Sequence, residues 1–208
     1  MKRRALIAAL CAVPCLIWAV TSQAEDADPA TQPIIALNAA ILDAMHAGHG
    51  KPFAERAAAL RPVVEKVFDL PLLLRNSVGN VRWPTIPDEQ KASLLEVFTQ
   101  FTVASYVANF DAFNGEKFII DHDNRKVEND VVVPSRIVAT NGDITKLDYV
   151  MRETDGVWHV VDILLDGSIS RVAVTRSDFR ALLGAGDASK LIDSLRSKVA
   201  NLAAGTAS

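Results

Sequence analysis

The sequence predicts an α+β fold in which helices come first, an antiparallel sheet follows, and further helices close the chain. Apolar residues recur at helical spacing from about residue 31 to residue 113, the period changes to two after Gly115, and helical spacing returns after about residue 175. Because helices and strands are segregated along the chain, we expect a curved antiparallel sheet of about four strands, wrapped by N-terminal and C-terminal helices.

The first 24 residues have the pattern of a secretory signal peptide. A basic start, Met1-Lys2-Arg3-Arg4, precedes an apolar run from residue 5 to residue 20, and Ser22-Gln23-Ala24 forms a small-x-small cleavage signal. The apolar run is short for a membrane span, which favours removal over a retained anchor. We therefore expect a signal peptide at 1–24, cleavage after Ala24 and one mature domain at 25–208.

Removal of this segment changes the chemistry that remains available. Both cysteines, Cys11 and Cys15, lie within it, so the mature chain would have no disulfide, no thiol nucleophile and no thiolate metal site. Three basic residues and no acidic ones leave with it, and the formal net charge moves from −3 to −6. This balance disfavours nucleic acid as a partner.

Four helices are expected in the first half of the chain. Their predicted limits come from proline, glycine and capping residues. The helices run from about Thr31 to Gly48, from Lys51 to Asp69 with a bend or split at Pro62, from Asp69 to Gly79, and from a capping box at Thr85 and Asp88 to Asn114.

The strands predicted next are organised around a hairpin. Two apolar runs, Leu147 to Met151 and Val157 to Leu165, flank Asp155-Gly156, which supplies the positive φ angles of a tight turn. Both faces of the second run are apolar, so both need covering. Earlier strands are expected at 117–122 and at 131–140, the latter interrupted by Pro134. Two helices follow, one capped by Thr175 and Asp178 and one at 187–202.

Residues that could perform chemistry are few. His46 and His49 have a two-histidine spacing, but Gly48 interrupts the helix and no third ligand is near, so we expect no metal. An acid–base set in a cavity remains an alternative, as in small isomerases with cone-shaped sheets. Its members would be Tyr106, Asp148, Tyr149, His159 and Asp162. We expect no catalytic residues and no cofactor.

A family resemblance extends over nearly all of the mature chain. A set of residues resembles, in order and spacing, the MlaC family of periplasmic phospholipid carriers, or toluene-tolerance proteins. The set is Phe68-Asp69, Val78-Gly79, Trp83, Gln90, Phe98, Phe101, Tyr106, Asp148-Tyr149, Trp158, Val161-Asp162, Asp166-Gly167-Ser168 and Phe179. The stretches TVASYVANFDAF, LDYVMR and DILLDGSISRVAVTRSDFRALL are similar to its hopanoid-associated branch, HpnM. Asp166-Gly167-Ser168-Ile169 departs from the acidic-Gly-Val-Ser loop of many phospholipid carriers, which leaves the identity of the lipid open.

The resemblance implies a soluble periplasmic carrier rather than an enzyme. Such a protein would bind the apolar part of a phospholipid or hopanoid and shuttle it between membrane transport complexes. From the absence of cysteine and of a ligand cluster in the mature chain we expect a monomeric or weakly associated protein that is stable without metal. The implied partners are an inner-membrane complex of the MCE and ABC-transporter type and an outer-membrane lipoprotein complex. The implied fold is an NTF2- or cystatin-like sheet with a helical subdomain around a hydrophobic pocket. An isomerase-like enzyme and a protein-binding adaptor remain the alternatives.

The expected pocket lies between the longest helix and the sheet, with a volume of about 1,000 Å³, as two lipid tails or a polycyclic lipid would require. We expect Gly167 to have a positive φ, and Arg171 and Arg176 to lie at the pocket mouth, where they could contact a head group or a partner. The predicted lining is Leu74, Val78, Phe98, Phe101, Tyr106, Phe110, Leu147, Tyr149, Met151, Trp158 and Val160.

Overall fold

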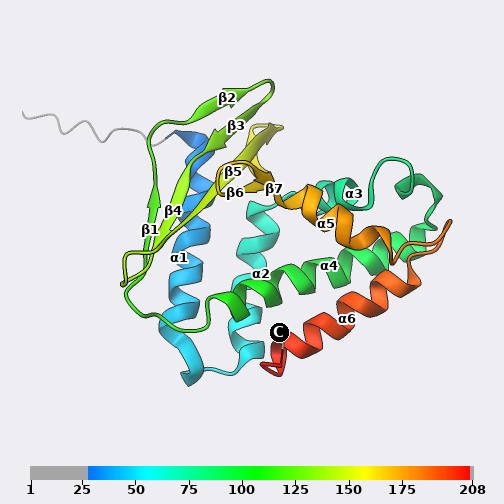
Figure 1. The fold of residues 1–208 in the computed structure, drawn as a ribbon, viewed down its shortest axis with the longest axis horizontal. Helices are drawn as coiled ribbons and strands as arrows, with labels where there is room; N and C mark the ends of the chain where they lie inside the picture. Colours follow the sequence, from blue (N-terminus) through cyan, green and yellow to red (C-terminus); the bar gives the residue numbers. More distant parts are fainter. Residues whose placement is uncertain (1–27, 207–208) are drawn as a thin grey trace, which may run out of the picture.

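A computed structural model of the protein describes residues 28–206, so the expected signal peptide lies outside the described residues. The fold is a mixture of helices and an open, curved antiparallel sheet (Figure 1). The helices are α1 (Gln32–Ala47), α2 (Phe53–Val67), α3 (Leu70–Val78), α4 (Asp88–Asn109), α5 (Arg171–Arg180) and α6 (Ser189–Ala203). The strands are β1 (Lys117–Ile120), β2 (Arg125–Val127), β3 (Asp130–Val133), β4 (Ser135–Val138), β5 (Ile144–Thr154), β6 (Val157–Leu165) and β7 (Ile169–Ser170).

The sheet is built on β5. One edge of this long strand pairs first with β4 and then with β3, and the other edge pairs with β6 along its length. The strand β1 extends the sheet beyond β4, β2 extends it beyond β3, and β7 adds a short pairing to β6. All of these pairs are antiparallel, as the sequence predicts.

The expected number of about four strands is wrong, because the sheet has seven. Pro134 divides the predicted strand at 131–140 into β3 and β4, since proline has no N–H to donate to a ladder. The residues opposite this break, 121–124, likewise separate β1 from β2, and the backbone N–H of Asp121 donates to the carbonyl of Pro134 at 2.9 Å. The strands β2 and β7 were not predicted, and together with the division at Pro134 they raise the number from four to seven.

The hairpin between β5 and β6 confirms the expected turn. Asp155 and Gly156 have φ angles of 52° and 79°, and Thr154 pairs with Val157 across the turn. The pairing register shifts further along, where Met151 faces Val160 while Val150 faces Asp162. The extra residue, Val161, breaks the simple alternation of faces, and it is buried together with Val160.

Two of the predicted helix starts are confirmed. Pro33 lies in the first turn of α1, and the Asp69 carboxylate caps α3 by accepting from the backbone N–H of Leu72 at 3.0 Å. Gly79, with a φ of 93°, follows the last turn of α3. Pro62 does not split α2, which continues through it without interruption.

Two predicted caps are wrong. Thr85 belongs to a short 3-10 turn, its hydroxyl donates to the carbonyl of Arg82, and α4 begins after Pro87. The next helix, α5, begins before Thr175, because the Ser170 hydroxyl accepts from the backbone N–H of Ala173. Pro87 precedes α4 without a side-chain cap, and Ser170 rather than Thr175 caps α5.

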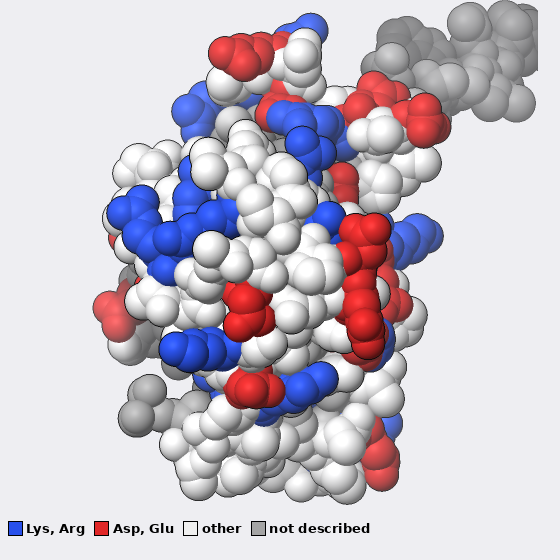
Figure 2. Space-filling model, turned by 90° about the vertical axis from the view of Figure 1, so that its right-hand side faces the viewer, with Lys and Arg blue, Asp and Glu red and all other residues white. Residues whose placement is uncertain are grey.

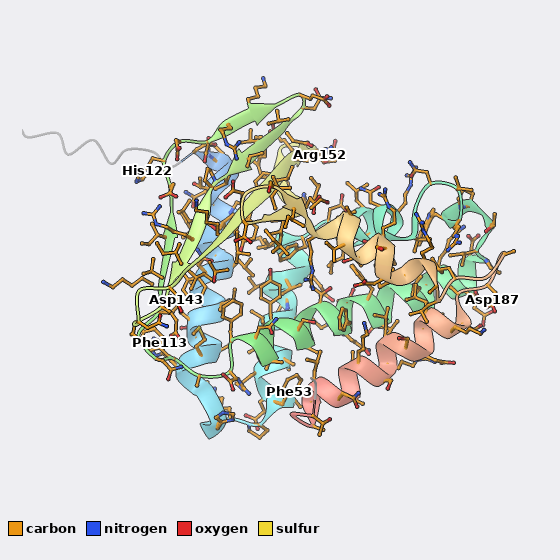
Figure 3. All side chains as sticks on the ribbon, in the orientation of Figure 1. Phe53, Phe113, His122, Asp143, Arg152 and Asp187 are labelled. Carbon is orange, nitrogen blue, oxygen red and sulfur yellow. The ribbon has the colours of Figure 1, made fainter. Side chains whose placement is uncertain are left out.

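The helices surround α4, the longest of them. Figure 1 shows α1 lying beside the sheet, α6 running along one side of α4, and α3 with α5 on the other. The end of the molecule away from the sheet holds the connection that leads into α6, where Figure 3 labels Asp187. No helix among residues 28–206 has both the length and the apolar character needed to cross a membrane.

Candidate functional site

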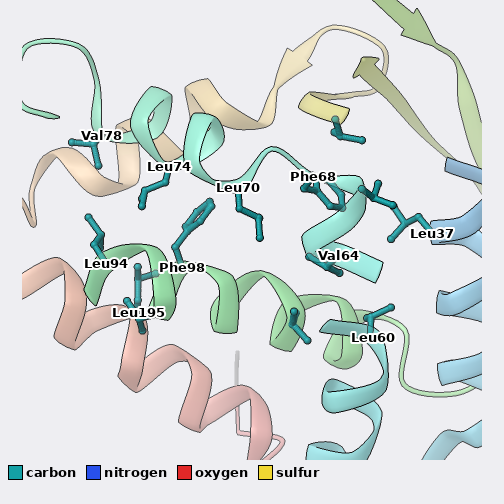
Figure 4. Close-up of a cluster of buried hydrophobic side chains, with 14 of the residues drawn as sticks. Leu37, Leu60, Val64, Phe68, Leu70, Leu74, Val78, Leu94, Phe98 and Leu195 are labelled. Carbon is teal, nitrogen blue, oxygen red and sulfur yellow. The ribbon is translucent and has the colours of Figure 1, made fainter. Parts of the chain in front are cut away.

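Four of the predicted lining residues lie in the helical half of the molecule. Leu74, Val78 and Phe98 meet Leu94 and Leu195 in a cluster between α3, α4 and α6 (Figure 4). The ring of Phe98 meets that of Phe179 edge to face at a centroid distance of 6.4 Å. Phe101 lies under the ammonium group of Lys198 on α6, at 5.7 Å. Phe98 and Phe101 therefore contact other helices, where we had expected them to cover the hairpin.

The aromatic side chains that do bridge α4 and the sheet form a continuous row. Tyr106 lies between Phe68 and Phe110, at centroid distances of 5.9 and 6.1 Å, and Phe110 lies 5.7 Å from Phe118 on β1. We call Phe68, Tyr106, Phe110 and Phe118 the aromatic seam. Two of its members, Phe68 and Phe118, were absent from the predicted lining.

Phe68 is placed by an unusual contact that no local pattern reveals. Its backbone forms an isolated parallel bridge with Val160, and the N–H of Asp69 donates to the Val160 carbonyl at 3.1 Å. The connection between α2 and α3 is thereby tied to the hairpin. Phe118 could have been found from its apolar neighbours, Ile119 and Ile120, in a short strand that follows a helix of aromatic residues.

The remaining predicted residues lie on the two strands of the hairpin. Tyr149, Met151 and Val160 are buried, with at most 3% of their surface exposed, whereas Leu147 and Trp158 are half-buried. All five belong to or pack against the same apolar core as the aromatic seam. The structure thus brings the sheet residues together with Tyr106 and Phe110 and leaves the α3 residues with α5 and α6.

Two tyrosines place polar groups inside this apolar region. Burial raises the pKa of the Tyr149 hydroxyl to about 12, and burial, with a smaller effect of Tyr149, raises the pKa of Tyr106 well above its usual value. The positive charge of Arg171 lowers the pKa of Tyr106, by less than burial raises it. Both phenols therefore stay neutral at physiological pH and can donate or accept hydrogen bonds.

The link from β6 to α5 is fixed by Asp162. Its carboxylate accepts from the Ser170 hydroxyl at 2.5 Å and from the backbone N–H of Val172 at 3.0 Å. Gly167, in the turn between them, has a φ of 74°, which confirms the predicted positive value. This arrangement holds Arg171 at the first turn of α5, while Arg176 lies further along the helix and donates to the carbonyl of Asn76.

The two carboxylates considered for acid–base chemistry, Asp148 and Asp162, both form structural contacts. The buried Asp148 pairs with Arg125 at 2.9 Å, and Asp162 holds the start of α5. The two histidines considered as metal ligands have different neighbours, since His46 contacts the ring of Phe113 and His49 lies 3.5 Å from Asp111. Among residues 28–206 no group of three or more His, Cys, Asp or Glu could hold a metal ion.

Two hollows in the described part of the chain are lined by residues outside the seam, and neither lies between α4 and the sheet, where the pocket was expected. One, of about 450 Å³, lies between the end of α3 and α5. The other, of about 380 Å³, lies between the start of α2 and the ends of α4 and α6. The side chains of the seam and of the hairpin belong to or pack against one apolar core.

Comparison with protein families identifies the group to which this fold belongs. The family model described as MlaC protein matches residues 36–197, which includes α2 to α5 and the whole sheet. The chain belongs to the MlaC family. The match contains the aromatic seam, the tyrosine pair and the Asp162 link, and it confirms the family resemblance predicted from the sequence, without separating the hopanoid-associated branch from other MlaC proteins.

A solved structure shares the fold of this MlaC-family chain. It is the phospholipid-binding protein from Ralstonia solanacearum, determined in complex with a phospholipid. The two chains are 19% identical, the similarity covers 84% of this chain and 97% of the other, and the TM-score is 0.69. No curated protein matches the chain.

Proposed function

We propose that this MlaC-family protein binds a phospholipid, with the acyl tails between α4 and the sheet, and carries it through the periplasm between the membranes. The observation that carries the proposal is the aromatic seam. It runs from Phe68, whose backbone bridges to β6, through Tyr106 of α4 and Phe110 at the end of that helix to Phe118 of β1. The phospholipid in the Ralstonia relative of the same fold supports a lipid as the ligand.

The seam suits a site that opens to admit its cargo. Each CH₂ group moved from water into an apolar site contributes about 0.8 kcal/mol of transfer free energy. Burial of two acyl tails can therefore offset the loss of the seam contacts that the tails displace. The other half of α4 is held by Phe98 and its neighbours on α3, α5 and α6. Separation of Tyr106 and Phe110 from Phe68 and Phe118 would therefore create the tail site without unfolding the helical half.

The polar end of the lipid would meet the tyrosine pair and Arg171. A buried neutral phenol can donate to an ester carbonyl, and an exposed arginine at the first turn of α5 can contact the phosphate. Arg171 is the arginine that acts on Tyr106. This assignment keeps Arg171 as the head-group contact predicted from the sequence.

The wider role follows from the family resemblance. We propose export to the periplasm with cleavage after Ala24, a monomeric carrier, and exchange of cargo with an inner-membrane complex of the MCE and ABC-transporter type and with an outer-membrane lipoprotein complex. The cargo is a phospholipid in the first instance. The similarity of Thr102 to Phe113 to the hopanoid-associated branch makes a hopanoid the second cargo to be sought.

Organic extraction and mass spectrometry of protein purified without detergent test this function. We expect a bound phospholipid or hopanoid in stoichiometric amount. Phe118→Glu, which places a charge in the seam, should abolish the bound lipid. Phe113→Glu is the matched control, because Phe113 is 38% exposed in the link between α4 and β1 and lies outside the seam.

The outcome can also count against the proposal. Circular dichroism and melting curves would show first that both variants are folded. Wild-type protein without extractable lipid would overturn the carrier function, and equal lipid in Phe118→Glu and Phe113→Glu would place the tails elsewhere. Turnover of an added small molecule would instead favour the isomerase-like alternative.

A further inference from the structure

A groove between the end of α3 and α5 carries an unusual concentration of arginines. It has a volume of about 450 Å³, and its lining includes Arg82, Arg176 and Arg180 together with Val78 and Val81. Figure 2 looks onto the end of the molecule where the α3–α4 connection lies, and it shows basic side chains gathered on one side of that face. The groove is separate from the aromatic seam.

The three arginines of the groove differ from most others in the described part of the chain. Arg61, Arg125, Arg136, Arg152 and Arg196 each form an ion pair with a carboxylate. No carboxylate of residues 28–206 lies within 4.0 Å of the charged nitrogens of the three groove arginines, since none of them forms an ion pair there. The groove is therefore positively charged without internal compensation in a protein whose net charge is negative.

The geometry of α5 preserves this charge. Asp178 lies two residues from both Arg176 and Arg180, and two residues correspond to about 200° of rotation around a helix, so its side chain leaves from the opposite side. Backbone carbonyls hold two of the arginines in place. Arg82 donates to the carbonyl of Arg180 at 2.7 Å, and Arg176 donates to that of Asn76 at 2.8 Å.

An exposed apolar side chain lies in the same groove. Val81 has 87% of its surface exposed, more than any other large hydrophobic residue among those described. It follows Gly79, whose φ of 93° turns the chain outward after α3. An exposed apolar side chain in the same groove as three arginines matches a membrane surface, where phosphates lie above the acyl region.

We propose that the groove formed by Arg82, Arg176, Arg180 and Val81 docks the protein on an anionic phospholipid surface. The arginines would contact head-group phosphates, and Val81 would enter the apolar region below them. This inference rests on the proposed carrier function, because it supplies the contact through which a carrier meets a membrane. It assigns Arg176 to docking and leaves Arg171 at the tail site.

A lipid surface fits the groove better than an acidic protein or a free phosphate. A free phosphate ion would satisfy the arginines but would leave Val81 in water. An acidic protein would need a pocket for Val81 among its carboxylates, whereas a lipid monolayer accepts an apolar side chain beneath its phosphates at any position. The negative charge of the rest of the chain would turn this face toward an anionic surface.

Vesicle co-sedimentation tests the proposal with the full mature chain. We expect binding to vesicles of phosphatidylcholine that contain one third phosphatidylglycerol, little binding to pure phosphatidylcholine, and loss of binding in 0.5 M salt because of screening. Replacement of both Arg176→Gln and Arg180→Gln should weaken the partitioning by about 30-fold, since each basic residue near such a surface contributes about fivefold. Val81→Ser should weaken it further.

The matched control removes the same charge from another face. Lys117 and Lys146 are exposed on the sheet and form no ion pair with a described residue, so Lys117→Gln with Lys146→Gln should leave the partitioning nearly unchanged. Equal loss in the two double variants would overturn the assignment to the groove. Wild-type protein that does not distinguish anionic from neutral vesicles would overturn the docking itself.

Extraction of lipid from the same samples separates this inference from the carrier function. Wild-type protein that contains lipid but ignores anionic vesicles would refute docking and leave the carrier function intact. Protein that binds anionic vesicles yet contains no lipid would refute the carrier function while the docking surface stands. A groove variant that keeps its lipid and loses its vesicle binding is the expected result.

Discussion

Ser170 and Asp162 join the hairpin to α5 through a hydrogen bond of 2.5 Å between the serine hydroxyl and the carboxylate. The second oxygen of the same carboxylate accepts from the backbone of Val172. One side chain of β6 therefore satisfies two donors at the start of the helix. The direction of α5, and with it the placement of Arg171 and Arg176, depends on this contact.

Replacement of Asp162 should destabilise the fold. Asp162→Ala leaves the N–H of Val172 and the hydroxyl of Ser170 without their partner, and a lost helix-terminal acceptor costs about 1–2 kcal/mol. Urea denaturation would measure the free energy of unfolding. Asp178→Ala is the control, because this exposed carboxylate on α5 has no ion pair with a described residue and should change the free energy by less than about 0.5 kcal/mol. Equal effects would refute the structural role.

The raised pKa of Tyr149 predicts that the folded protein loses stability at high pH. Tyr149 has a pKa of about 12 in the folded protein and an ordinary value of 10 when unfolded. Between these values the unfolded chain releases the proton and the folded chain keeps it, so stability is fully present below pH 10 and falls as the pH rises toward 12. The loss should reach about 3 kcal/mol.

Denaturation curves between pH 8 and pH 11.5 would measure about 2 kcal/mol of this loss, because the folded-state pKa of about 12 lies above that range. Tyr149→Phe cannot release a proton, so its free energy of unfolding should fall less steeply than that of wild type over this range. Lysine residues also titrate there, but they are common to both proteins and cancel in the difference. Parallel curves for the two proteins would show that the Tyr149 hydroxyl is accessible to water in the folded state.

Two phenylalanines on α4 should respond differently to truncation. Phe98 is 8% exposed and packs against Phe179, so Phe98→Ala should cost about 3–5 kcal/mol in the free energy of unfolding. Phe101 is half-buried beneath Lys198, and Phe101→Ala should cost about 1–2 kcal/mol. Neither change should alter the lipid content, because both side chains face other helices. A change of cargo in Phe98→Ala would extend the tail site beyond the seam.

Gly167→Ala should destabilise the fold, because a residue with a side chain is strained at this backbone conformation. A Cβ atom there would lie 3.6 Å from the Asp148 carboxylate, an ordinary contact, so the cost comes from the φ of 74° and amounts to about 1–2 kcal/mol. Gly50→Ala is the matched control, since Gly50 has open space around it and no positive φ. Thermal melting of the two variants would decide the point. Equal melting temperatures would contradict the backbone argument.

Elements with local signals were predictable from the sequence. The Asp-Gly turn placed the hairpin, and Asp69 placed the start of α3, because both depend on neighbours in the chain. The start of α5 depends on Asp162, a residue from another element, and residue spacing cannot report such a contact. The division of the sheet at Pro134 was visible, but its effect on the opposite strand was not.

The lining residues of the candidate site could be predicted only in part, because the sequence does not show how α4 is oriented. This helix contacts α2, α3 and α6, and Phe110 at its end contacts Phe118 of β1, so apolar residues occur on several of its faces. Helical periodicity identifies such a helix but cannot tell which face meets which neighbour. Tyr106 and Phe110 were therefore assigned to the same surface as Phe98 and Phe101, which the structure separates.

The position of β5 determines which part of the protein can move when cargo enters. Its backbone is hydrogen bonded on both edges, to β6 on one side and to β3 and β4 on the other. Its amide protons should consequently exchange with solvent only when the whole sheet opens, whereas the contacts of α4 with the sheet involve no backbone ladder. During loading, the C-terminal turns of α4 would move away from the sheet while the sheet keeps its structure. Hydrogen exchange should then be slow in β5 and faster in these turns of α4.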